Sequence, residues 1–381
     1  PAFPPCAPET IMHSNAQGAS TLRTRFLAIQ ALERAANTYW FLTLGLRLLP
    51  VGVVVAAGYL LPVPLAAVAE RIGSGRCVAA ALLLTALGFV AGGSNPDVAA
   101  GLITLGSALF RASFGPTLAR SDDPGIFPLA NVTINLAATL TGLWYGRGLV
   151  ALGPRQLDYC MAMGLLLAFA VAIPLLPVRG VRSAAFVAPA AAALSETNYL
   201  RFAASLLGHL LVYVPLWGYQ TTYRESQVEL MRACGLPIGA VFGTLCATAM
   251  LTSMLLGMRR ASRALEQVQL LQVTGSLLVC GSLLAARAID SAQLVASHKC
   301  ALVLAGAGVY GVGEALFASG AHRSLMSLAP SREVGSAAYF ATIGLGAFLS
   351  TLFTGPLYPV QLAGFAVAGS VVFFCAGASE R

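Results

Sequence analysis

Long apolar segments, separated by short polar or glycine- and proline-containing breaks, run through the chain from about residue 25 to its end. A segment of about 20 apolar residues is long enough to cross the hydrocarbon core of a bilayer as a helix. Only 10% of the 381 residues are charged and 57% are hydrophobic, whereas a soluble domain carries roughly 25% charged residues. The sequence therefore predicts an all-α membrane protein with many spans, whose first partner is the lipid bilayer.

The apolar segments fall into two sets of about six helices each, separated by the polar stretch "PVRGVRSAAFVAPAAAALSETN". Two such sets are expected when a membrane protein is built from structural repeats. We predict an N-terminal six-helix bundle at 25–177, a cytoplasmic linker at 178–197 and a C-terminal six-helix bundle at 198–378. Residues 1–24 are polar and rich in proline, and they are expected to form a disordered tail.

The net charge of +8 comes mainly from arginines that lie in short clusters between the apolar segments. Basic clusters in this position set the orientation of a membrane protein, because positively charged loops stay in the cytoplasm. Their distribution over the predicted loops favours cytoplasmic N- and C-termini. The same distribution gives no reason to expect a nucleic-acid partner.

The sequence shows no pattern typical of catalysis or metal binding. The eight cysteines have no spacing typical of metal ligands, and most are expected to be small buried hydrophobic residues. No set of serine, histidine and aspartate and no pair of carboxylates has a spacing that favours catalysis. The sequence predicts a protein that is not an enzyme and that needs no metal or cofactor.

Charged residues inside the predicted spans are the main functional signal. An ionisable group at the bilayer centre costs about 2.5–3.5 kcal/mol on insertion scales, so it normally faces a protein interior or a water-filled cavity. The first predicted helix carries a polar stripe at helical spacing, and further polar groups recur on later helices: Gln30, Glu33, Arg34, Asn37, Arg111, Asn131, Asn135, Arg201, Ser205, His209, Tyr213, Trp217 and Glu314.

Two interpretations fit such a set. Isolated polar residues often make structural contacts between packed helices. Because charged residues recur on several helices of both halves, we favour a central cavity with opposite charges on its walls.

Several segments resemble known families, in the same order along residues 25 to 355. "ALERAANTYWFLTLGLRLL" resembles the first-helix signature ExxERxxYY of the proton-dependent oligopeptide transporters, with Glu33 and Arg34 at its Glu-Arg pair. "AAVAERIGSGR" resembles the loop between helices 2 and 3 of the major facilitator superfamily, with Glu70, Arg71 and Arg76 at the charged positions. "LFRASFGPTLARSDDPGIFPLANVTINLAATLTG" and "GVGEALFASGAHRSLMSLAPSREVGSAAYFATIGLGAFLS" resemble the helix 4–5 and helix 10–11 regions of the transporters.

The resemblance implies a major facilitator fold of about 12 transmembrane helices. It also implies proton-coupled symport of di- and tripeptides or similar small zwitterions, histidine and nitrate being further candidates, with the proton gradient in place of a cofactor. In that family, cations on helices 1 and 4 hold the peptide carboxylate, which here are Arg34 and Arg111. A helix 10 glutamate and a helix 5 asparagine hold the amino group, which here are Glu314 and Asn135, and a helix 7 tryptophan lines the pocket, here Trp217.

The resemblance further implies proton coupling through Glu33 and Glu314, gating at Glu70, Arg71 and Arg76, and a place in the plasma membrane or an endolysosomal membrane. The chain departs from the signature at Gln30, which replaces the first acid, and at Asn37, which replaces a tyrosine. These departures keep a second hypothesis open. A family relative that has lost transport would serve as a membrane scaffold for a cytoplasmic adaptor.

Overall fold

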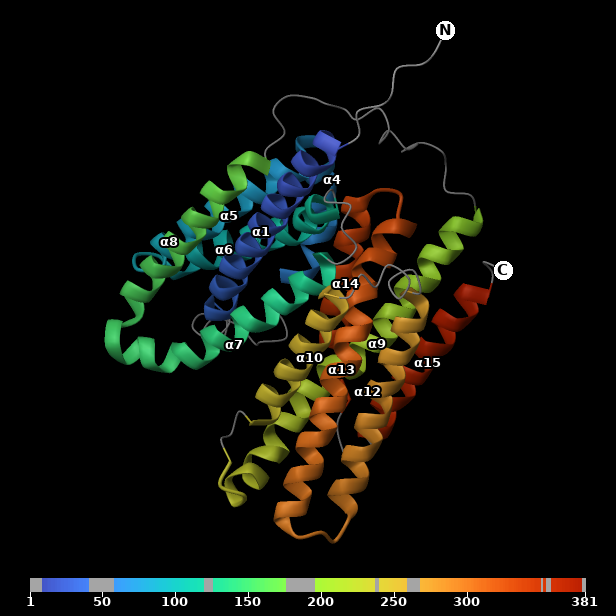
Figure 1. Ribbon diagram of the computed structural model, residues 1–381. Helices are drawn as coiled ribbons and strands as arrows, with labels where there is room; N and C mark the ends of the chain where they lie inside the picture. The colour runs from blue at the N-terminus through green and yellow to red at the C-terminus, as the bar shows by residue number, and fades with distance from the viewer. Residues whose placement is uncertain are drawn as a thin grey trace.

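The computed structural model describes residues 9–40, 58–119, 126–175, 196–236, 240–258, 268–350, 352–353 and 358–378. Within these ranges every element is a helix (Figure 1). The elements are α1 (Glu9–Trp40), α4 (Pro62–Ile72), α5 (Ser74–Ala91), α6 (Pro96–Leu118), α7 (Ile126–Leu152), α8 (Pro154–Ala172), the short 3₁₀ helix η3 (Ile173–Leu175), α9 (Glu196–Ala233), α10 (Ala240–Met258), α12 (Val268–Ser291), α13 (Ala296–Leu328), α14 (Arg332–Ser350) and α15 (Tyr358–Ala378).

Six described helical segments are long and apolar enough to cross a membrane: Ser74–Ala91, Pro96–Leu118, Pro154–Ala172, Tyr199–Gly218, Leu270–Ile289 and Ala296–Leu328. Three shorter apolar segments lie in α7, α10 and α15. Large apolar side chains are exposed on many of these helices, among them Leu87, Met163 and Leu255. Exposed apolar residues of this size suit contact with lipid rather than water. The predicted total of about 12 spans stays a prediction, because part of the chain, such as 41–57, lies outside the described residues.

Two hydrophobic cores divide the helices into two groups. The first core joins α1, α5, α6 and α8 through buried residues such as Phe89, Ile103 and Leu165. The second joins α9, α12, α13 and α15 through residues such as Tyr310, Phe317 and Phe373. We call residues 9–175 the first half and residues 196–378 the second half, and Figure 1 shows them side by side, with α14 next to α4. The predicted linker, 178–197, lies outside the described residues except for its last two positions, which belong to α9.

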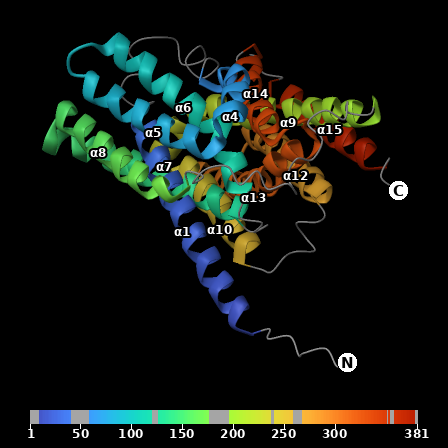
Figure 2. The same cartoon turned by 90° about the horizontal axis from the view of Figure 1, so that it is seen from above.

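The N-terminal segment differs from its prediction. Helix α1 begins at Glu9, so residues 9–24 are helical where a disordered tail is expected. In Figure 2 the first turns of this helix project away from the other helices. The stretch contains alanine, leucine, arginine and glutamine, which favour a helix once a following apolar segment has nucleated one. Proline content misleads here because the prolines lie before Glu9.

Local sequence signals set several helix ends. Asn95 caps α6, since its side-chain oxygen accepts a hydrogen bond of 3.1 Å from the backbone N–H of Val98. Gly73 (φ 100°) separates α4 from α5, and Gly153 (φ 76°) separates α7 from α8. Both have a positive φ that residues with a side chain rarely adopt, which allows these tight connections.

The two halves are hydrogen-bonded to each other where α14 meets α4, α5 and α6. Ser74 donates to a carboxylate oxygen of Glu333 at 2.6 Å, and Ser331 donates to Glu70. Arg332 donates to the Ala119 carbonyl at 3.2 Å. Ser336 donates to the Arg111 carbonyl at 2.9 Å. We call this set of four hydrogen bonds the joint.

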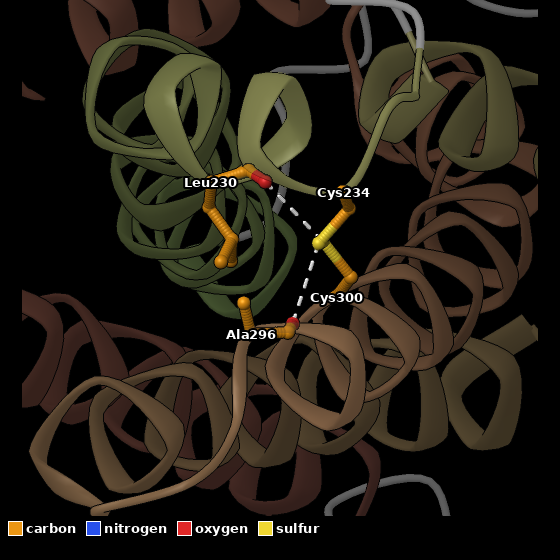
Figure 3. The surroundings of a disulfide bond; sticks show 4 residues. All are labelled: Leu230, Cys234, Ala296 and Cys300. Atoms are coloured by element: carbon orange, nitrogen blue, oxygen red, sulfur yellow. Dashed lines mark hydrogen bonds between the residues drawn. A yellow bond between two sulfur atoms is a disulfide. The ribbon is translucent and has the colours of Figure 1, made fainter.

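A disulfide joins Cys234, which follows α9, to Cys300, in the first turn of α13 (Figure 3). Their Cα atoms are 6.9 Å apart, and 66 residues separate them in the sequence. The two sulfur atoms lie close to the carbonyl oxygens of Ala296 and Leu230. Nothing in the sequence indicated this pair, since most cysteines were expected to be small buried residues. Cys77, Cys246 and Cys280 are buried and free, as expected, whereas Cys160 is free and exposed.

Candidate functional site

A cavity of about 240 Å³ lies between the two halves. The first half contributes polar residues from α1, α6 and α7, and the second half contributes polar residues from α9, α13 and α14. They are Gln30, Glu33, Arg34, Asn37, Arg111, Asn131 and Asn135 on one side, and Tyr213, Glu314, His322 and Tyr339 on the other. The structure thus brings together in one cavity all five residues that the resemblance assigns to substrate binding, Arg34, Arg111, Asn135, Trp217 and Glu314.

Glu33 is held by a hydrogen-bonded network within the first half. Asn37, one turn later on α1, donates its side-chain N–H to Glu33. The oxygen of the same amide accepts a hydrogen bond of 2.6 Å from Ser107 on α6. All three side chains are buried, with at most 5% of their surface exposed. Asn37 therefore satisfies a buried carboxylate that would otherwise lack a donor, which explains the amide where the signature has a tyrosine.

Arg111 is fixed by contacts within the first half, and its charge interacts with that of Glu33. Its Nη1 donates to the Gly58 carbonyl at 2.6 Å, and its guanidinium lies over the Tyr59 ring, 4.1 Å from the centroid. A planar guanidinium can make a backbone hydrogen bond and stack on an aromatic ring while its other N–H groups stay directed elsewhere. Only 6% of Arg111 is exposed, and that remainder faces the cavity.

Arg34 connects the charges of the two halves. It interacts electrostatically with Glu33 beside it and with Glu314 across the cavity. Its Nε is buried and has no hydrogen-bond acceptor among the described residues. A buried guanidinium N–H without an acceptor is costly, so this atom offers a donor to a ligand.

Glu314 is the carboxylate of the second half. It lies on α13, and its Oε2 is buried without a hydrogen-bond donor among the described residues. Its charge interacts electrostatically with Arg34 across the cavity. A buried carboxylate oxygen is normally hydrogen-bonded, so Glu314 can accept a bond from a cationic or N–H-bearing ligand.

Asn135 and Trp217 complete the predicted set. One N–H of the Asn135 side-chain amide donates to the Asn131 carbonyl at 3.1 Å, and the amide oxygen can accept a hydrogen bond from another group. Trp217 lines the cavity from α9 and packs beside Tyr59 and Ile343. An aromatic wall of this kind provides an apolar surface between charged ends.

The polar residues predicted at helical spacing from Arg201 to Trp217, now on α9, form a stripe that divides into two parts. Tyr213 and Trp217 line the cavity. His209 is fully buried inside the second half, where its ring nitrogens lie 2.5 Å from the Ser205 carbonyl and 3.0 Å from the Gln272 amide nitrogen. His209 therefore packs as a hydrogen-bonded core residue, away from the cavity.

The three predicted gating residues lie in two different environments. Glu70 takes part in the joint through Ser331. Arg71 and Arg76 lie on the exposed surface near the turn at Gly73. The resemblance did not point to Ser74, Ser331 and Glu333, which carry the other contacts on this side of the joint.

Two further cavity residues were not singled out from the sequence, His322 and Tyr339. His322 lies eight residues after Glu314 on α13, which places the two on the same face of the helix. This spacing is the sequence signal that could have indicated it. Tyr339 lies on α14, and its ring stacks on His322 with centroids 4.3 Å apart.

The fold and the cavity together define a multi-pass membrane protein with a charged internal cavity. Solved structures of POT peptide transporters share this fold. One in complex with sulfate matches with a TM-score of 0.63 at 14% identity and covers 94% of each chain. A glutamate-to-glutamine mutant of a POT transporter matches with a TM-score of 0.60 at 13% identity, covering 94% of this chain and 93% of the other.

The same kind of mutant in complex with alafosfalin matches with a TM-score of 0.59 at 14% identity and the same coverage. No protein-family profile matches the chain, and no curated protein sequence matches it. The likeness is therefore one of fold. It is a fold whose matched examples are membrane transporters and not enzymes.

Proposed function

We propose that this protein is a secondary transporter that carries di- and tripeptides, or similar small zwitterions, in symport with protons by alternating access. The observation that carries the proposal is the charge arrangement of the cavity. Arg34 and Arg111 provide donors on the first half, and Glu314 provides an unpartnered carboxylate oxygen on the second half. A zwitterion needs cations at its carboxylate and an anion at its ammonium group.

The size and lining of the cavity favour a small substrate. About 240 Å³ is a little below the range of roughly 300–1,000 Å³ typical of pockets for drug-sized ligands. Trp217, Phe110 and Phe127 add apolar surface between the charged ends. Such a site suits a short peptide whose two charged ends meet opposite halves, so that binding and the relative motion of the halves are linked.

For orientation, we propose that the N- and C-termini face the cytoplasm, in the plasma membrane or an endolysosomal membrane. The disulfide supports this arrangement. In the predicted topology, the end of α9 next to Cys234 and the start of α13, which carries Cys300, lie on the side away from the cytoplasm. Disulfides persist in such compartments and are rare in the cytosol.

The experiment is a thermal-shift titration of the purified protein with matched ligands. The N-acetyl derivative of a dipeptide lacks the charge at the amino end, and the C-terminal amide lacks the charge at the carboxyl end. The free dipeptide should raise the melting temperature, since a ligand that binds only the folded state stabilises it. Both blocked forms should bind roughly 10- to 150-fold more weakly, the effect of one lost charged hydrogen bond.

Two variants test which side chain binds the carboxylate end of the dipeptide and which binds the amino end. Arg34→Ala should lose the preference for the free carboxylate over the amide while keeping the preference for the free amine. Glu314→Gln should show the opposite pattern. If no peptide or amino acid stabilises the folded protein, and a cytoplasmic adaptor binds it, the scaffold hypothesis replaces this one.

A further inference from the structure

His322 has no part in the transport proposal, yet it lies where the cavity meets the joint. Its ring lines the cavity together with Glu314. Its Nε2 lies 3.0 Å from the hydroxyl of Ser336 on α14. That hydroxyl donates its hydrogen to the Arg111 carbonyl on α6, so its oxygen accepts a hydrogen from His322. A chain of two hydrogen bonds therefore runs from the second half, through Ser336, to the first half.

The imidazole is enclosed by helices of both halves. It stacks on Tyr339, with the rings 7° from parallel, and meets the edge or face of Phe340 at 5.5 Å. From the first half, Phe127 on α7 meets it at 5.6 Å. The α6 backbone also approaches closely at Gly115, where a Cβ would lie 2.5 Å from the imidazole. Only glycine leaves room for the ring at this point, so the ring and α6 fit each other.

The other joint contacts differ from this one in position. The pairs Ser74–Glu333 and Ser331–Glu70 join the halves at residues that do not line the cavity. His322 both lines the cavity and donates to a hydroxyl that bonds the opposite half at the joint. Asn131, which also lines the cavity, bonds Ser253 of the second half at 2.9 Å, but this contact joins α7 to α10, away from α14. Arg111, whose backbone carbonyl accepts the hydrogen bond from Ser336, and Glu314, on the same helix as His322, also line the cavity.

We propose that His322 is a positioning residue that couples the content of the cavity to closure of the joint. This inference rests on the proposed alternating-access function. Movement of α13 toward or away from a ligand at Glu314 moves the donor that holds Ser336, and with it the contact to Arg111. Separation of the halves at the joint requires this chain of hydrogen bonds, from His322 to Ser336 and from Ser336 to Arg111, to break.

Three variants separate the contribution of the His322–Ser336 hydrogen bond from that of the packing of the His322 ring. His322→Phe keeps a flat ring against Tyr339 and removes the donor. Ser336→Ala removes the middle of the chain and nothing larger than a hydroxyl. His322→Gln is the matched control, because its amide N–H reaches about as far as Nε2 and restores the donor.

The measurement uses the full-length, ligand-free protein. Spin labels at Ile72→Cys and Ser327→Cys, two exposed positions in opposite halves near the joint, report the ratio of separated to closed molecules by electron–electron distance measurement. The free cysteines are replaced and the disulfide is kept. His322→Phe and Ser336→Ala should each raise that ratio about fivefold, as expected for one net hydrogen bond. His322→Gln should stay within about twofold of the parent.

A second measurement detects molecules with separated halves even when they are a small fraction of the sample. Cys77 is buried in the first half near Glu333 of the second half. In a protein without spin labels that keeps Cys77 while the other free cysteines are replaced, the rate of Cys77 alkylation by a small maleimide follows the open population even when that population is small. The inference is overturned if His322→Phe and Ser336→Ala leave both measurements unchanged, or if His322→Gln shifts them as much as His322→Phe. Because no substrate is present, these results are independent of the dipeptide titration that tests the proposed function.

Discussion

The two halves present their carboxylates to the cavity in different ways. Glu33 accepts a hydrogen bond from Asn37, which is in turn held by Ser107, so it is bonded within its own half. Glu314 has a buried oxygen without a donor among the described residues and faces Arg34 of the opposite half. One carboxylate is thus part of a fixed wall, and the other is open to a partner from the cavity.

The difference suggests a division of roles. A side chain held in a closed network keeps its position and charge as the halves move. An unpartnered one can exchange a proton, a substrate ammonium group and Arg34 as successive partners. We therefore expect Glu314 to be the principal coupling group and Glu33 to support it through its charge interactions with Arg111 and Arg34.

The largest effect is expected from Glu314→Gln. The amide keeps the shape of the side chain but cannot carry a proton, so accumulation of substrate driven by an imposed pH gradient should fall to equilibrium across the membrane. Exchange of labelled for unlabelled substrate at fixed pH should partly survive, because it needs no net proton movement. Uptake into proteoliposomes measures both. If Glu314→Gln accumulates substrate as well as the parent protein, proton coupling belongs to another group, and Glu33 is the next candidate.

A smaller effect is expected from Asn37→Ala, which removes the donor to Glu33. Leaving a buried carboxylate without this bond should cost about 1–3 kcal/mol of unfolding free energy and lower the melting temperature in detergent. Ser107→Ala tests the network, because the double variant should cost less than the sum of the single ones if the three residues act together. Strict additivity would mean that Glu33 is not held in the way described.

The sequence predicted the components of the site better than their connections. Charges inside apolar segments are costly, so Arg34, Arg111 and Glu314 could be recognised from the sequence alone, and the fold brings them to one cavity. Their partners were not predictable, because contacts such as Asn37 with Ser107, 70 residues apart, depend on how helices pack. The disulfide is a similar case, since two single cysteines 66 residues apart have no recognisable spacing.

The division of the polar stripe on α9 shows a different limit. Helical periodicity placed His209 and Tyr213 on one polar face, but a face of one helix can meet two environments. His209 meets Gln272 of α12 inside the second half, whereas Tyr213 and Trp217 meet the cavity. Periodicity determines which residues share a face, and only the neighbouring helices determine what that face touches.

Removal of the disulfide should have a modest effect on the second half. It ties α13, which carries Glu314, to the end of α9, which carries Trp217. In a soluble chain, a disulfide that closes a loop of this length contributes up to about 4 kcal/mol. The contribution should be smaller here, because membrane helices stay inserted after unfolding. Cys234→Ser with Cys300→Ser should lower the melting temperature by a few degrees and weaken dipeptide binding less than about twofold. A loss of binding as large as that of Arg34→Ala would mean that the disulfide positions the cavity itself.

The smallest effect is expected at Gln30, one turn before Glu33 on α1. Gln30 lines the cavity and is only 8% exposed, but its amide cannot titrate. Gln30→Ala should therefore leave the dependence of uptake on the pH gradient unchanged and alter KM by at most a few-fold, as expected for one neutral polar contact. Gln30→Glu is the informative partner, since it adds a titratable group next to the Glu33 network. It should change the pH dependence of uptake, whereas Gln30→Ala should not. If Gln30→Ala abolishes the response to the gradient, the first half does more than hold Arg34 and Glu33 in place, and the proposed difference between the two halves fails.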